Sequence, residues 1–166
     1  MRRRVVAGLL AGAAVTATGC SSPGLPEVSF YADGEAVNAA PLIYCDAVVS
    51  ACEQDENAAA KIRVRPGMPV QVSVPSEVSE TPWVVNVQYA DATGALKPVK
   101  QEFFTQGSRL AYTATGDAPG DQVLVVEIQQ LGAAYAADAS GAPIPDAEGN
   151  PQLVIRGLWS FQTQLA

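Results

Sequence analysis

Alternation of apolar and polar residues over short runs, with a turn after each run, is the feature that most constrains the fold of this chain. The clearest run covers residues 82–89, where every second residue is large and apolar: Trp83, Val85, Val87 and Tyr89. Side chains of a β-strand point alternately to its two faces, so this run predicts a strand with one buried face. Asn86 and Gln88 would lie on the other face.

Similar runs recur along the chain, at residues 28–31, 61–65, 70–74, 108–115, 123–130 and 153–163. A further segment continues from the Asp33-Gly34 turn to about residue 44, and a helical turn or a loop is expected after Cys52. In the run 123–130, Leu124, Val126 and Ile128 are expected on one side. About eight short strands with at most one short helix predict a mainly β protein, an antiparallel immunoglobulin-like β-sandwich.

The first 19 residues have the three parts of a secretory signal: the cationic start Arg2-Arg3-Arg4, an apolar run over residues 5–17, and a small-residue exit. The run is shorter than the roughly 20 residues of a membrane-spanning helix. The exit, Ala17-Thr18-Gly19-Cys20, resembles the lipobox of bacterial lipoproteins, although Leu is more usual than Ala at its first position. The resemblance implies cleavage before Cys20 and a diacylglyceryl group on its thiol. The alternative is an ordinary signal that leaves Cys20 as a spare thiol.

These observations divide the chain into three parts. Residues 1–19 form the signal peptide, residues 20–26 form a lipidated tether with two prolines, and residues 27–166 suit a single β-sandwich domain. Without a second hydrophobic span, the N-terminal lipid alone would attach the protein to the extracytoplasmic face of the cell membrane.

Composition excludes several function classes. All 17 acidic residues follow Cys20 and three of the ten basic residues precede it, so residues 20–166 carry a net charge of −10. This charge argues against nucleic acid as a partner. The chain has no histidine, which excludes Ser-His and Cys-His catalysts and the usual imidazole zinc sites. We therefore assign no catalytic residue, metal ligand or cofactor.

Cys45 and Cys52 are the other two cysteines. In an exported protein such a pair is most simply a disulfide. A redox or metal pair is the alternative, but the spacing is not C-x-x-C and no further Cys or His completes a metal shell.

Several short segments together resemble a known family. The segment 74–83 leads into Gln88-Tyr89, Trp159-Ser160-Phe161 follows near the end, and the lipobox and the Cys45/Cys52 region complete the set. These marks are similar to those of an actinobacterial, mycobacterial-type lipoprotein family of unknown function. The resemblance implies a small envelope lipoprotein and brings no activity or ligand.

The strongest candidate for partner binding is a cationic stripe formed by Lys61, Arg63 and Arg65 on one strand face. It would dock an acidic partner or a lipid phosphate, or else be a solvated face that protects an edge strand. Trp83 and Trp159 are expected in the core, with ligand stacking as the alternative.

Two groups of oxygen-bearing residues have weaker alternatives. Glu77 and Glu80 would need to converge across a cleft for acid/base catalysis, and a solvated turn is expected instead. The insertion at residues 131–151 has oxygen-bearing side chains that could hold calcium, at Asp138, Ser140, Asp146, Glu148 and Asn150. A solvated loop is expected there.

Three function classes follow. The first is a non-catalytic accessory or interaction module of the cell envelope, with an envelope protein or lipid as its partner. The second is a binder or carrier of a lipid or small molecule, and the third is a carboxylate-based envelope hydrolase.

Overall fold

The computed structural model describes residues 24–145 and 149–164. Eleven strands and one short helix lie in this part of the chain: β1 (Val28–Ala32), β2 (Glu35–Ala39), β3 (Ile43–Cys45), β4 (Cys52–Gln54), β5 (Ala60–Arg63), β6 (Val70–Ser73), α1 (Ser76–Ser79), β7 (Trp83–Ala90), β8 (Lys100–Phe104), β9 (Ala111–Ala114), β10 (Gln122–Tyr135) and β11 (Leu153–Gln164). The predicted signal peptide and Cys20 lie outside the described residues.

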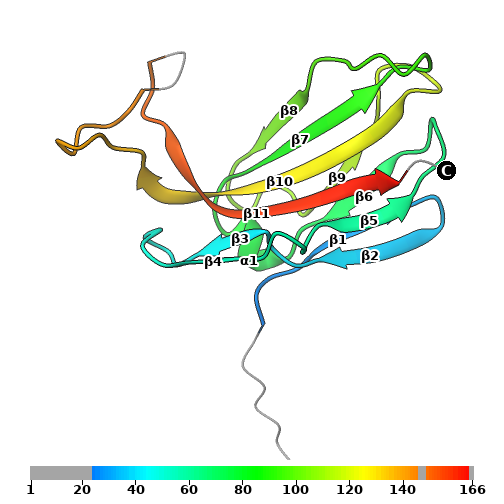
Figure 1. Cartoon of the computed structure of the whole chain (residues 1–166). Helices are drawn as coiled ribbons and strands as arrows, with labels where there is room; N and C mark the ends of the chain where they lie inside the picture. The colour runs from blue at the N-terminus through cyan, green and yellow to red at the C-terminus, as the bar shows by residue number, and fades with distance from the viewer. Residues whose placement is uncertain (1–23, 146–148, 165–166) are drawn as a thin grey trace, which may run out of the picture.

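The strands form two sheets that pack face to face (Figure 1). Sheet A has the order β2-β1-β6-β9, and sheet B has the order β4-β3-β11-β10-β7-β8, with β5 added alongside β11. All pairs are antiparallel except β5 with β11. The predicted fold class, a mainly β antiparallel sandwich with one short helix, is confirmed.

Alternation along the strands produces the core as the sequence predicts. Strand β1 buries Val28, Phe30 and Ala32, and β6 buries Val70 and Val72. The Asp33-Gly34 turn joins β1 to β2, with Ala32 paired to Glu35. Gly34 has a φ of 89°, and Asp33 also has a positive φ, as such tight hairpin turns require.

Both tryptophans lie in the core, as predicted. Trp83 and Trp159 are fully buried. The Trp83 ring lies 4.3 Å from that of Phe104, and the Trp159 ring lies 6.0 Å from that of Tyr44, measured between centroids. The Trp159 Nε1–H also donates a 2.9 Å hydrogen bond to the carbonyl oxygen of Pro26. This bond fixes the first described residues against the sandwich.

Three local predictions were wrong. Leu124 does not share a side with Val126, because a bulge in β10 sets Val123 opposite Tyr89 and Val125 opposite Gln88. The extra residue reverses the alternation, so Val123 is buried while Leu124 is only half-buried.

The other two concern the course of whole segments. The segment expected to run to residue 44 is divided into β2 and β3, with Pro41 between them. Of the helical turn or loop expected after Cys52, the structure has a loop with a turn at residues 55–59, preceded by β4, and the short helix is α1, after Pro75. The insertion at 131–151 is also more regular than expected, since β10 and β11 continue into it as a paired arm that projects from the sandwich (Figure 1).

The predicted disulfide is present: Cys45 and Cys52 are bonded to each other and lie directly opposite in the β3–β4 hairpin. Reducing it should lower the free energy of unfolding by about 2–3 kcal/mol, because the unfolded chain regains the freedom of a short loop. Urea denaturation with and without a reducing agent measures this difference, and intact mass verifies complete reduction. Unchanged stability after complete reduction would contradict the prediction.

Candidate functional site

The cationic stripe predicted as a partner site lies at the exposed side of β5. Lys61 is paired with Gln162 of β11 and Arg63 with Gln164, and both cationic side chains are exposed. Arg65 differs from them, because its Nε–H donates to Asp33 Oδ2 at 2.8 Å and its guanidinium forms an ion pair with that carboxylate. The pair lowers the pKa of Asp33. Arg65 therefore links the β1–β2 turn to the segment that follows β5, and Lys61 and Arg63 remain as the open part of the stripe.

The carboxylates considered for catalysis or calcium binding do not converge in the described residues. Glu77 and Glu80 are exposed at α1. Asp138 accepts hydrogen bonds from the backbone N–H groups of Ser140 and Ala142, so it caps its own turn. Asp146 and Glu148 lie outside the described residues. Within residues 24–145 and 149–164, no three Cys, Asp or Glu side chains are placed to hold a metal ion.

The outer face of sheet A carries a surface that was not predicted from the sequence. Pairing across the four strands aligns exposed side chains in two rows. We call these eight residues the uncharged face: Asn38, Ser29, Ser73 and Ala111 in one row, and Ala36, Tyr31, Gln71 and Thr113 in the other. None of them carries a charge at neutral pH, although residues 20–166 have a net charge of −10.

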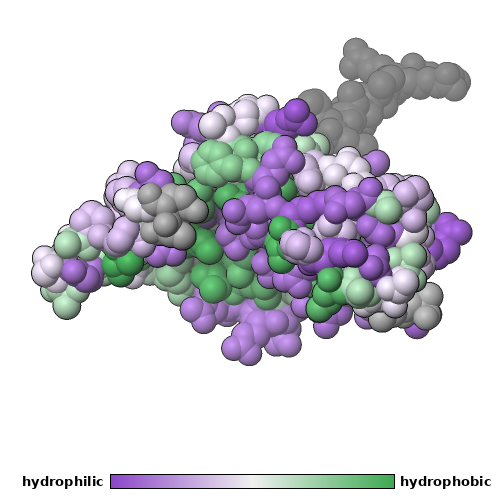
Figure 2. Space-filling view, turned by 90° about the horizontal axis from the view of Figure 1, so that it is seen from above, coloured by the Kyte–Doolittle hydropathy of each residue, from purple (hydrophilic) through white to green (hydrophobic). Residues whose placement is uncertain are grey.

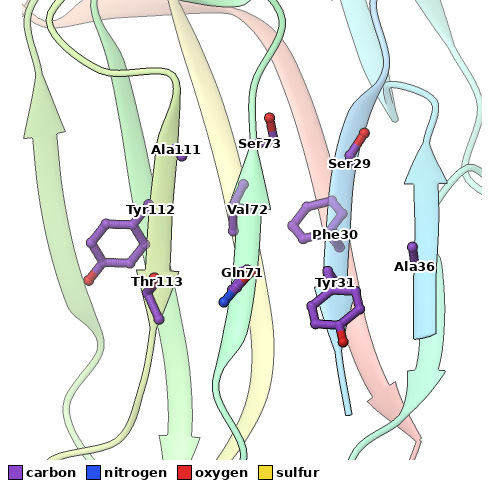
Figure 3. Close-up of a pocket in the computed structure, with 10 residues that line it drawn as sticks. All are labelled: Ser29, Phe30, Tyr31, Ala36, Gln71, Val72, Ser73, Ala111, Tyr112 and Thr113. Atoms are coloured by element: carbon purple, nitrogen blue, oxygen red, sulfur yellow. The ribbon is translucent and has the colours of Figure 1, made fainter. Parts of the chain in front are cut away.

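A hollow of about 400 Å³ lies on this face. Figure 3 shows the side chains of Tyr31, Gln71 and Thr113 side by side on neighbouring strands, with Ala36 beyond Tyr31. Tyr31 is the one aromatic residue of the face and is 47% exposed. On the other side of β1, Phe30 points into the core and stacks on Phe161, so packed aromatic rings lie behind the face.

Polar side chains on the uncharged face are available for hydrogen bonding. Ser29 Oγ donates to Asn38 Oδ1 at 2.8 Å, which leaves the Asn38 amide N–H groups free. Gln71, Ser73 and Thr113 make no side-chain hydrogen bond to the rest of the described chain. The face can therefore offer both donors and acceptors to a ligand, together with one aromatic ring.

A second exposed surface lies near the arm. Figure 2 shows hydrophobic side chains gathered between the arm and the body of the molecule. Tyr135, Ile144 and Ile155 are exposed hydrophobic residues of the arm segments. The described residues contain no helix that could span a bilayer, since α1 has only four residues.

A polar cluster closes the end of the sandwich where β7 finishes. Asp117 accepts a hydrogen bond from the Tyr89 hydroxyl and forms a 2.7 Å ion pair with Lys100. Lys100 also lies over the Tyr89 ring, 4.8 Å from its centroid. The hydrogen bond to Asp117, together with burial, raises the pKa of Tyr89 to about 12. The cluster fixes the loop after β9 and leaves Tyr89 protonated at neutral pH.

The stability contributed by Asp117 should depend on pH. Lys100 and then Tyr89 lower the pKa of this carboxyl below its ordinary value of 3.8. A depressed folded-state pKa stabilises the fold above the ordinary value and ceases to do so as the pH falls through the folded-state pKa. The melting temperature should therefore fall more between pH 5 and pH 2 in the wild type than in Asp117→Asn. Parallel curves for the two proteins would contradict this assignment.

The fold and the uncharged face define the class of protein as a β-sandwich domain with an exposed, neutral polar sheet face. Comparison with known families adds that residues 21–164 match the model of a family described as "Protein of unknown function (DUF2771)". The chain belongs to this family. Uncharacterized proteins of Mycobacterium bovis and of two Mycobacterium tuberculosis strains are each 29% identical to it over 136 residues, which is 80% of this chain and 80% of each relative. No solved structure matches.

Proposed function

We propose that this protein is a non-catalytic binding module of the cell envelope, anchored to the extracytoplasmic side of the membrane by a lipid on Cys20. The observation that carries the proposal is the uncharged face. One exposed Tyr among Ser, Asn, Gln and Thr side chains can contact a partner through an aromatic ring and adaptable hydrogen bonds, as Tyr, Ser and Asn do in antibody binding loops. It does not provide the converging acid and base that a hydrolase needs.

The sequence before the sandwich supports the anchoring. Cys20 follows the lipobox-like residues Ala17-Thr18-Gly19, and Pro26, six positions later, is held by Trp159. Six extended residues span at most about 20 Å. A lipid on Cys20 would thus keep the domain close to the membrane, where its effective concentration for a membrane-associated partner is high.

Lipidation is tested by Cys20→Ser. The variant should lose the diacylglyceryl mass and leave the membrane fraction, either as unprocessed precursor or as released protein. Mass spectrometry of the wild-type N-terminal peptide and fractionation of both proteins check this. A wild-type mature protein that starts at another residue and carries no lipid would refute the anchoring.

The binding face is tested by photocrosslinking in living cells. A benzophenone amino acid replaces Gln71 on the uncharged face or, as a matched control, the exposed Gln54 on β4, which belongs to neither the uncharged face nor the cationic stripe. The proposal predicts a crosslinked product at position 71 that is missing at position 54. Equal products at both positions, or none at position 71, would refute this face as the binding surface.

A further inference from the structure

We propose that the uncharged face binds a neutral polysaccharide chain. This inference rests on the proposed binding function and adds the chemical class of the ligand. Charge gives the first argument: the eight residues have no cation to attract an anionic polymer, while the rest of residues 20–166 is strongly acidic and repels one. A neutral polymer is not repelled by the acidic surface, and it needs no cation on the face in order to bind.

The size of the face gives the second argument. Neighbouring strands lie about 4.8 Å apart and residues i and i+2 about 6.7 Å apart, so two rows across four strands cover roughly 250 Å². A stable protein–protein interface needs about 800 Å² from each partner. Charged residues bound the face along β1, with Glu27 before it and the Asp33–Arg65 ion pair after it. The neutral area is therefore too small for a stable protein–protein interface but wide enough for a single polymer chain.

The side chains give the third argument. A sugar ring has an apolar C–H face and a rim of hydroxyl groups, and each hydroxyl both donates and accepts hydrogen bonds. The half-exposed Tyr31 ring offers a surface for the apolar face, and small Ala36 beside it leaves room for the ligand. The amides of Gln71 and Asn38 and the hydroxyls of Ser73 and Thr113 match the rim, because they also combine donors with acceptors.

The test uses the full-length lipidated protein in phosphatidylcholine nanodiscs. The probes are three neutral hexasaccharides, namely maltohexaose, cellohexaose and the N-acetylglucosamine hexamer, and an anionic galacturonic acid hexamer. Saturation-transfer NMR with titration measures binding to the wild type and to Tyr31→Ala, Tyr31→Phe and Gln71→Ala. The matched control is Tyr135→Ala, since Tyr135 lies on the arm and is 54% exposed, close to the 47% of Tyr31.

At least one neutral hexasaccharide should bind with a dissociation constant of about 1 mM, and the anionic hexamer should not. Tyr31→Ala should weaken binding about tenfold or more and Gln71→Ala should also weaken it. Tyr31→Phe, which keeps the ring, and Tyr135→Ala should both stay within about twofold of the wild type. Unchanged melting temperatures would show that the exposed substitutions leave the fold intact.

The possible failures are distinguishable. A protein crosslinked at position 71, with no hexasaccharide bound, would overturn the polysaccharide class and leave the proposed binding function standing. No product at position 71 and no hexasaccharide bound would refute both. Hexasaccharide binding that Tyr31→Ala does not weaken would show that the sugar binds elsewhere and would overturn the inference.

Discussion

Replacing Trp83 with alanine should lower the free energy of unfolding by about 3–5 kcal/mol, the usual cost of removing a large aromatic side chain from a closed core. The side chain is fully buried at the start of β7 and packs against Phe104 of β8. Its loss leaves a cavity in the core between the two sheets, which the surrounding side chains can fill only in part. Urea denaturation followed by far-ultraviolet circular dichroism measures the change.

Phe103 provides the matched control. It is the neighbour of Phe104 on β8 but points outward and is 53% exposed, so Phe103→Ala should change the stability by no more than about 0.5 kcal/mol. If Trp83→Ala were as stable as the wild type, the placement of the ring in the core would be wrong. Loss of ligand binding by that stable variant would favour the alternative in which Trp83 stacks on a ligand.

Gly157→Ala should also be strongly destabilising, by about 1–3 kcal/mol or more. A Cβ at this position would lie 2.5 Å and 2.7 Å from two atoms of the Trp159 ring and 3.1 Å from Tyr44 Cδ2. The ring cannot move aside freely, because its Nε1–H is bonded to the Pro26 carbonyl oxygen and Tyr44 packs on its side. Glycine is thus required here for space, not for an unusual backbone conformation.

Two further variants separate this cause from a general effect of losing a glycine. Gly24→Ala should be neutral, since nothing lies within 4 Å of a Cβ built at that position. In the Gly157→Ala background, Trp159→Phe should cost less stability than it costs in the wild type, because the smaller ring leaves room for the new methyl group. A double variant whose loss of stability equals or exceeds the sum of the two single losses would contradict the proposed steric contact.

The strands around Phe30 and Val72 were found where the sequence placed them, and their burial alternates as predicted. Strand β7 was also found where it was predicted, but the expectation of one buried face was wrong: Val84 and Asn86 are buried as well, and of its eight residues only Gln88 is exposed. Strand β8 was missed because its pattern is uninformative: of its five residues only Phe104 is buried, and Phe103 faces solvent next to Glu102. The bulge at Leu124 also could not be predicted from the sequence, because it depends on how β10 pairs with β7.

The uncharged face could not be predicted from the sequence, for a related reason. Each strand of sheet A shows exposed polar residues such as Ser29, Gln71 and Thr113 at alternate positions, and the sequence reveals that much. It does not reveal that β1, β2, β6 and β9 are neighbours, because β9 reaches β6 only after the chain has passed through β7 and β8 of the other sheet. The cationic stripe, in contrast, could be predicted because its three residues lie in one short segment. The ion pair between Arg65 and Asp33 could not be predicted, because these residues are 32 positions apart in the sequence.

The central place of β11 in sheet B has a consequence for the timing of folding. This strand pairs with β10, β3 and β5, and its partners in β5 lie about a hundred residues earlier in the chain. Contacts between such distant segments close large loops and slow the search for the native state. During synthesis from the N-terminus, β3 and β5 would lack their partner strand until β11 is made, so sheet B would be completed only when almost the whole chain is present.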